Sequence, residues 1–93
     1  MGNEKPIVIE KASEFAERLK ESPKATDVDF ANIMAHQLSS ILWEAKLAYP
    51  HSNELKHLFD EQRLFTSTHS ETPGILLNNV NDSLKQLLSI INE

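Results

Sequence analysis

Histidines and carboxylates are the first side chains of this sequence whose types could support chemistry. Four histidines occur, at His36, His51, His57 and His69, and imidazole binds metals and accepts protons or phosphoryl groups near neutral pH. Glu54 and His57 form a Glu-x-x-His pair, a spacing that carboxylate-bridged di-iron bundles use twice. Helical spacing places this pair opposite the apolar side of its own segment, whereas ligands in such bundles project inward. We therefore expect an exposed polar stripe here, with no metal site and no cofactor.

The sequence contains no motif that would activate a nucleophilic side chain. Cysteine is absent, so thiolate chemistry and zinc sites built on sulfur are excluded. Glycine occurs only at Gly2 and Gly74, which leaves no phosphate-cradling loop and no glycine-bearing elbow around any serine. Neighbouring carboxylates such as Asp27 and Asp29 fit a helix start and need no catalytic role. We expect that the protein is not an enzyme.

His36 lies in a segment with a recognisable pattern. The chain reads F-x-x-x-x-x-H-x-L-x-S from Phe30, and it includes the hexapeptide AHQLSS. This pattern resembles the phospho-accepting helix of two-component histidine kinases and the acceptor segment of histidine-phosphotransfer domains. The resemblance implies a four-helix bundle in which an exposed His36 exchanges a phosphoryl group with a response regulator. The sequence departs from the pattern at Gln37, where kinases carry an acid, and at Ser39, which replaces a basic residue. An ordinary, partly exposed histidine is the other interpretation.

The first two of four predicted helices position His36. The first covers residues 11–21. The second begins near Thr26 or Asp27, where TDVD fits a capping box. It ends near Tyr49, because Pro50 cannot continue a helix. Its apolar positions follow steps of three and four residues, at Phe30, Met34, Leu38, Ile41, Ala45 and Ala48, with Ile33 and Leu42 widening the stripe.

Two further helices complete the predicted bundle. Ser52 is a plausible cap for the third helix, whose apolar side comprises Leu55, Leu58, Phe59 and Phe65. The segment 66–74, TSTHSETPG, is the expected connector, with Thr72 as a cap and Pro73 in the first position of the fourth helix. The apolar positions of the fourth helix are Leu77, Val80, Leu84, Leu87 and Ile91, and its polar face comprises Asn78, Asn79, Asn81 and Ser83.

The N-terminal stretch PIVIE, residues 6–10, does not fit the helical pattern of the rest of the chain as clearly. Consecutive β-branched residues favour an extended backbone, but a lone strand has no ladder partner in a helical chain. The alternative is the start of the first helix, with Val8 beneath Ala12. We therefore divide the chain into an N-terminal segment, residues 1–10, and one helical domain, residues 11–93. The fold class is all-α: a small four-helix bundle with a short first helix, a long second helix, and third and fourth helices. The sequence leaves open whether residues 6–10 are an extended segment or the start of the first helix.

Composition limits the partners. The 93 residues suit one domain, and the net charge of −5 argues against an electrostatic grip on nucleic acid. The basic residues after position 25 are scattered, at Lys46, Lys56, Arg63 and Lys85. A small helical nucleic-acid-binding regulator is thus the second alternative, behind phosphotransfer by His36. No apolar stretch approaches membrane-spanning length and no signal peptide is recognisable, so we expect a cytoplasmic protein without a membrane role.

The stretch FANIMAHQLSSILW, residues 30–43, carries no charge in a chain where 25% of the residues are charged. Small neutral polar groups beside a tryptophan are typical of protein contacts, where charged groups are depleted. The main expectation is therefore a small acidic protein–protein interaction module, such as an adaptor, a regulator or an inhibitor of the immunity-protein type. Its partner is another protein or a second copy of the chain. The predicted contact residues are Asn32, His36, Gln37, Ser40 and Trp43.

Overall fold

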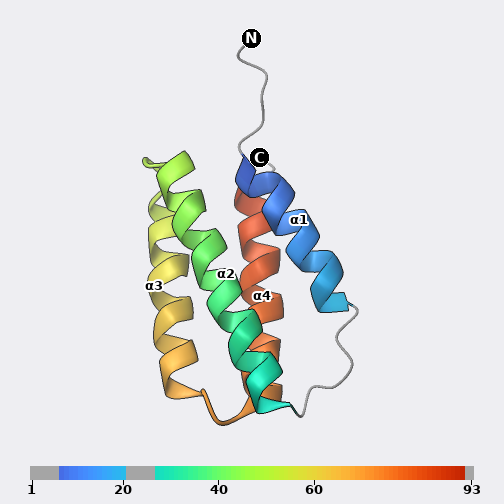
Figure 1. The fold of residues 1–93 in the computed structure, drawn as a ribbon. Helices are drawn as coiled ribbons and strands as arrows, with labels where there is room; N and C mark the ends of the chain where they lie inside the picture. The colour runs from blue at the N-terminus through green and yellow to red at the C-terminus, as the bar shows by residue number, and fades with distance from the viewer. Residues whose placement is uncertain (1–6, 21–26, 92–93) are drawn as a thin grey trace.

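The chain folds into a bundle of α-helices. The computed structural model describes residues 7–20 and 27–91, which form α1 (Ile7–Lys20), α2 (Val28–Ala48), α3 (Asn53–Thr68) and α4 (Pro73–Ile91). α2, α3 and α4 lie side by side in roughly one direction, and α1 lies at a slant beside α2 (Figure 1). The predicted all-α four-helix bundle is confirmed.

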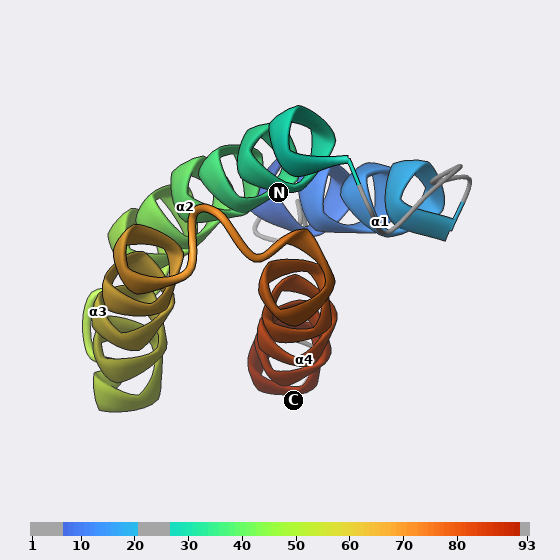
Figure 2. The ribbon, with the colours of Figure 1, turned by 90° about the horizontal axis from the view of Figure 1, so that it is seen from below.

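The order of the helices around the bundle decides which surfaces remain open. α2 and α4 contact each other and both remaining helices, whereas the described parts of α1 and α3 do not touch. Figure 2, an end view, shows α2 along the outer edge, α1 and α3 on its two flanks and α4 on the far side. α2 is therefore covered on both flanks and from behind, and its fourth side faces away from the bundle.

One apolar core joins the four helices. The predicted apolar stripes supply most of this core, because residues three and four apart share a helix face. Ile33 and Ala48, which were assigned to the stripe of α2, are exposed. Among the side chains with essentially no exposed surface, the largest apolar ones are Phe15, Leu38, Leu42, Leu55, Leu76, Leu87 and Val80. Burying each of these contributes about 1.5–3 kcal/mol. No described helix combines the length and apolar composition that a bilayer crossing requires.

Two helix starts are fixed by capping side chains. The Asp27 carboxylate accepts a hydrogen bond from the Phe30 amide at 3.1 Å. The cap is thus Asp27, one of the two predicted start positions. The predicted capping box placed the hydroxyl of Thr26 at the cap, and Thr26 lies outside the described residues. The Ser52 hydroxyl accepts from the Leu55 amide at 3.2 Å, which confirms the predicted cap of α3. α2 ends at Ala48, directly before Tyr49 and Pro50, as expected.

Of the two interpretations of residues 6–10, the start of the first helix is confirmed for residues 7–10, and the extended segment is wrong there. These residues form the first turn of α1, and residues 1–6 lie outside the described part of the chain. Val8 and Ala12 are both buried on the same stripe as Phe15. Burial of Val8 against the core outweighs the extended preference of its β-branched neighbours, because tertiary packing overrides local propensity. The helical domain therefore begins before residue 11.

The connector between α3 and α4 is shorter than the predicted segment 66–74. α3 continues through Thr68, since Thr66 is buried and its hydroxyl donates to the Gln62 carbonyl oxygen at 2.8 Å. Pro73 is the first residue of α4, as predicted. The Thr72 hydroxyl donates back to the His69 carbonyl oxygen at 3.1 Å, and the Thr72 carbonyl accepts the first bond of α4, from Leu76. Ser83, assigned to the polar face of α4, is buried.

Candidate functional site

The side of α2 that faces away from the bundle carries a continuous stripe, which we call the outward face. It consists of Ile33, His36, Ser40, Trp43 and Leu47, spaced by steps of three and four residues. Such steps keep side chains on one side of a helix. Ile33, Trp43 and Leu47 expose 52%, 49% and 65% of their surface. The stripe contains no Lys, Arg, Asp or Glu residue, and Phe59 and Lys46 partly cover its Trp43 ring.

The predicted contact residues divide between this face and its flanks. His36, Ser40 and Trp43 lie on the outward face. Asn32 lies on the α3 flank, where its amide donates to the Ser70 carbonyl at 2.7 Å and to the Val28 carbonyl at 2.9 Å. Asn32 therefore fastens α2 to the α3–α4 connector.

Gln37 lies on the opposite flank, facing α1. It is half-buried and lines the groove between α1 and α2. Its Oε1 atom is buried and accepts no hydrogen bond from any described residue. On the same flank, the Lys11 ammonium of α1 lies 2.7 Å from the Glu44 carboxylate. This ion pair joins α1 to α2 beside the outward face.

The placement of Ile33 corrects a prediction. The sequence assigned Ile33 to the apolar stripe that faces the core, but it projects from the outward face. Leu47 was not assigned to any surface. Both lie seven residues from Ser40, and residues seven apart occupy nearly the same side of a helix. This spacing, set against the buried positions such as Leu38, was the signal in the sequence that could have separated Ile33 and Leu47 from the core.

Trp43 is partly held in place by α3. Its ring centroid lies 5.7 Å from that of Phe59. The Lys46 ammonium lies 5.0 Å from the Trp43 ring centroid and 4.4 Å from that of Phe59, so it makes cation–π contacts with both rings. An exposed aromatic ring with restricted motion loses little conformational freedom when a partner covers it.

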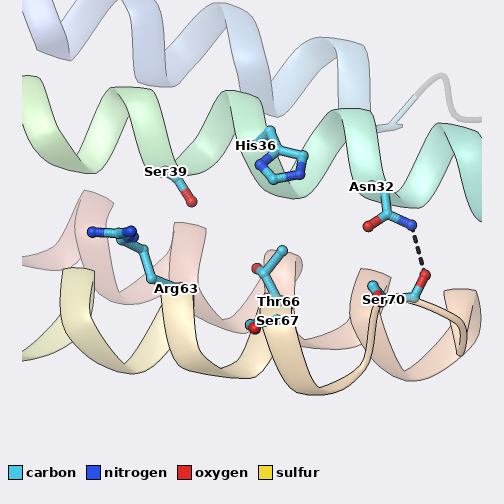
Figure 3. A pocket seen from close by; sticks show the side chains of 7 residues that line it. All are labelled: Asn32, His36, Ser39, Arg63, Thr66, Ser67 and Ser70. Atoms are coloured by element: carbon cyan, nitrogen blue, oxygen red, sulfur yellow. Dashed lines mark hydrogen bonds between the residues drawn. The ribbon is translucent and has the colours of Figure 1, made fainter.

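A polar groove separates α2 from α3 next to the outward face. It has a volume of about 390 Å³ and is lined by Asn32, His36, Ser39, Arg63, Thr66, Ser67 and Ser70. Figure 3 shows the His36 ring projecting from α2 and the Arg63 side chain rising from α3 at one end. His36 is exposed and makes no hydrogen bond with a described residue, and none of the described lining residues is acidic. This groove has the polarity to admit an anionic group.

The hydroxyls in the floor of this groove are engaged in the fold. Gln62 is buried, and its amide nitrogen donates to the Ala35 carbonyl at 3.0 Å and to the Thr66 hydroxyl at 3.1 Å. The Ser39 hydroxyl donates to the Gln62 Oε1 atom. This network links α2 to α3, and the sequence did not indicate it, because Gln62 carries no motif that marks it as buried.

A smaller hollow lies beside Leu47, at the C-terminal end of the outward face. It has a volume of about 330 Å³ and is lined by Ile7, Val8, Glu44, Leu47 and Ala48. It lies between the beginning of α1 and the end of α2, so an apolar side chain can rest against Ile7 and Leu47. We call it the α1–α2 hollow.

The histidine and carboxylates of α3 lie at the surface. Glu54, His57 and Glu61 are all exposed, and the His57 Nε2 atom lies 2.7 Å from the Glu61 carboxylate. Within residues 7–20 and 27–91, no three histidine or carboxylate side chains are grouped closely enough to hold a metal ion.

Fold and surface together define a small four-helix bundle with an exposed, uncharged and partly apolar face on its longest helix. Comparisons with models of known protein families, with curated proteins and with solved structures find no match to this chain.

Proposed function

We propose that the protein is a small protein-binding module of the cytoplasm that docks through the outward face of α2. Its activity is the occupation of a partner's surface, as expected of an adaptor, a regulator or an inhibitor of the immunity-protein type. The observation that carries this proposal is the exposure of Ile33, Trp43 and Leu47 on one uncharged stripe.

Physical arguments support a protein partner. The stripe itself contains no Lys, Arg, Asp or Glu residue, and charged residues are depleted at the centres of interfaces because their desolvation is costly. Charged side chains border the stripe instead: Lys46 at Trp43, and Lys11, Glu14 and Arg18 in the groove beside Ser40. Tryptophan is enriched among the residues that dominate binding energy, and Trp43 is already oriented by Phe59 and Lys46. Apolar residues scattered singly over a surface are normal, whereas three on one side of one helix are typical of a docking surface.

A matched pair of variants tests the proposal. Leu47 lies on the outward face of α2, and Leu64, which is 70% exposed, lies on α3. Leu47→Lys places a charge at the contact and should abolish capture of the partner from a lysate of the source cells, whereas Leu64→Lys should leave it unchanged. Equal capture by both variants, or no capture by the unmodified protein and no self-association, would contradict a binding function of this face.

A second candidate function is phosphoryl acceptance by His36. It is favoured by the exposed His36 imidazole at the edge of a groove that also contains the Arg63 guanidinium. Incubation with a phosphorylated response regulator should then label the protein, and His36→Gln should abolish the label while His57→Gln preserves it. An unlabelled protein rejects this function.

A further inference from the structure

The fold brings together basic residues that lie far apart in the sequence. The Lys46 ammonium of α2 lies 4.4 Å from the Phe59 ring centroid, and the Arg63 guanidinium of α3 lies 5.5 Å from it, so one ring holds cations from both helices. Arg63 lines the polar groove between α2 and α3, and Lys56, seven residues earlier, lies on the same side of α3. We call Lys46, Lys56 and Arg63 the basic edge.

The cations of the basic edge have no acidic partner in the described part of the chain. None of the ion pairs found there includes Lys46, Lys56 or Arg63. Asp60 shares this side of α3, four residues after Lys56 and three before Arg63, and this one carboxylate does not balance three cations. The edge is therefore positive in a protein whose net charge is −5.

The opposite flank of α2 differs in this respect. There the Lys11 ammonium and the Glu44 carboxylate lie 2.7 Å apart and neutralise each other. The groove on that flank is lined by Glu14 as well as by Lys11 and Arg18. The excess of positive charge is thus confined to the α3 side of the outward face.

The basic edge borders the outward face at Trp43. The Lys46 ammonium lies 5.0 Å from the Trp43 ring centroid, and 49% of the Trp43 surface is exposed. Arg63 lines the same groove as His36, a member of the outward face (Figure 3). A partner that covers Trp43 therefore also approaches these cations. Charged groups at the rim of an interface select a partner of opposite charge and speed its encounter.

We propose that the partner of the outward face is a protein segment rich in acidic residues. Its apolar side chains cover Trp43 and Leu47, and its carboxylates lie over the basic edge. This inference rests on the proposed function, since it names the chemistry of the partner that docks on the same face. A protein segment suits this surface better than a nucleic acid, because three cations neutralise few phosphates and the adjoining stripe is apolar.

Trp43 is the only tryptophan of the chain, so its fluorescence reports on the basic edge. Relative to their quenching of N-acetyltryptophanamide, iodide should quench Trp43 at least about twofold more strongly than Cs⁺ at low ionic strength, because a positive potential concentrates anions. Lys56→Gln should lower the quenching by iodide, and Lys85→Gln, the same change on α4, should not. Neutral acrylamide should quench all three proteins equally. Equal relative quenching by iodide and Cs⁺ would overturn the proposal.

A synthetic peptide provides the binding probe. It is an amphipathic helix of about 18 residues, with leucines on one side and glutamates beside them. In fluorescence titrations it should bind about tenfold more tightly than the same peptide with glutamine at each glutamate, and the difference should shrink in high salt. Arg63→Gln and Lys56→Gln should each weaken its binding by about two- to threefold, whereas Lys85→Gln should leave it unchanged.

Two results would overturn an acidic protein partner. One is equal affinity for the glutamate and glutamine peptides, or no binding of either. The other is tighter binding of an oligothymidylate of about 15 nucleotides than of the glutamate peptide, which would identify a nucleic-acid partner instead.

The proposed function fails separately from this inference. If Leu47→Lys abolishes capture of a partner while the peptides show no preference for glutamate, the outward face still binds a protein and only the acidic partner is refuted. If Leu47→Lys and Leu64→Lys capture the partner equally, docking through the outward face is refuted, whatever the quenching by iodide.

Discussion

Replacing the buried Gln62 with alanine should lower the free energy of unfolding by about 2–3 kcal/mol. Gln62 is 1% exposed and its side-chain amide makes three hydrogen bonds, to Ala35, Thr66 and Ser39. Each is worth about 0.5–1.5 kcal/mol net, and the lost methylene adds about 0.8 kcal/mol. The released side-chain entropy offsets up to about 2 kcal/mol of this loss.

Urea denaturation followed by the helical circular dichroism signal measures this change. Gln86→Ala on α4 is the matched control, because Gln86 is exposed and should change stability by less than about 0.5 kcal/mol. In thermal unfolding, the Gln62→Ala midpoint should fall by about 10–20 °C, from about 4–8 °C per kcal/mol for a domain of this size.

The variant Gln62→Leu separates hydrogen bonding from volume. It fills most of the space but removes the amide, so it should be less stable than the unmodified protein and more stable than Gln62→Ala. Equal stability of Gln62→Ala and Gln86→Ala would refute the reasoning, because it would mean that the network between α2 and α3 contributes nothing.

Three further perturbations act on other parts of the bundle. Phe15→Ala removes the largest side chain by which α1 enters the core and should cost about 3–5 kcal/mol in urea denaturation; a loss below 1 kcal/mol would show that α1 is not packed as described. Asp27→Ala removes the cap of α2 and should cost about 1 kcal/mol, whereas Asp27→Asn should retain most of the stability. Glu44→Gln breaks the exposed pair with Lys11 and should change the thermal midpoint by only a few degrees, with the difference vanishing in high salt; a larger change would mean that this pair fixes α1 in place.

Several features of the candidate site were predictable from the sequence. The uncharged stretch around His36 marked α2 as the helix with an exposed surface of unusual composition. His36, Ser40 and Trp43 do lie on the outward face. Asn32 and Gln37 do not. They lie at the border between the polar and apolar sides of α2, where contact with α3 or α1 decides whether a residue is exposed.

The sequence by itself determined the helices, most of their ends and the apolar stripes that form the core. Ser52 and Pro73 act within a turn of the chain, since capping and proline geometry are local, and the periodic spacing of Leu38 and Leu42 already places them on one side of α2. Only the tertiary structure decided which sides are covered. The angle of a residue around its helix follows from its number, but whether that angle meets solvent depends on where α1 and α3 lie. For this reason Ile33, an apolar residue, is exposed and Gln62, a polar one, is buried.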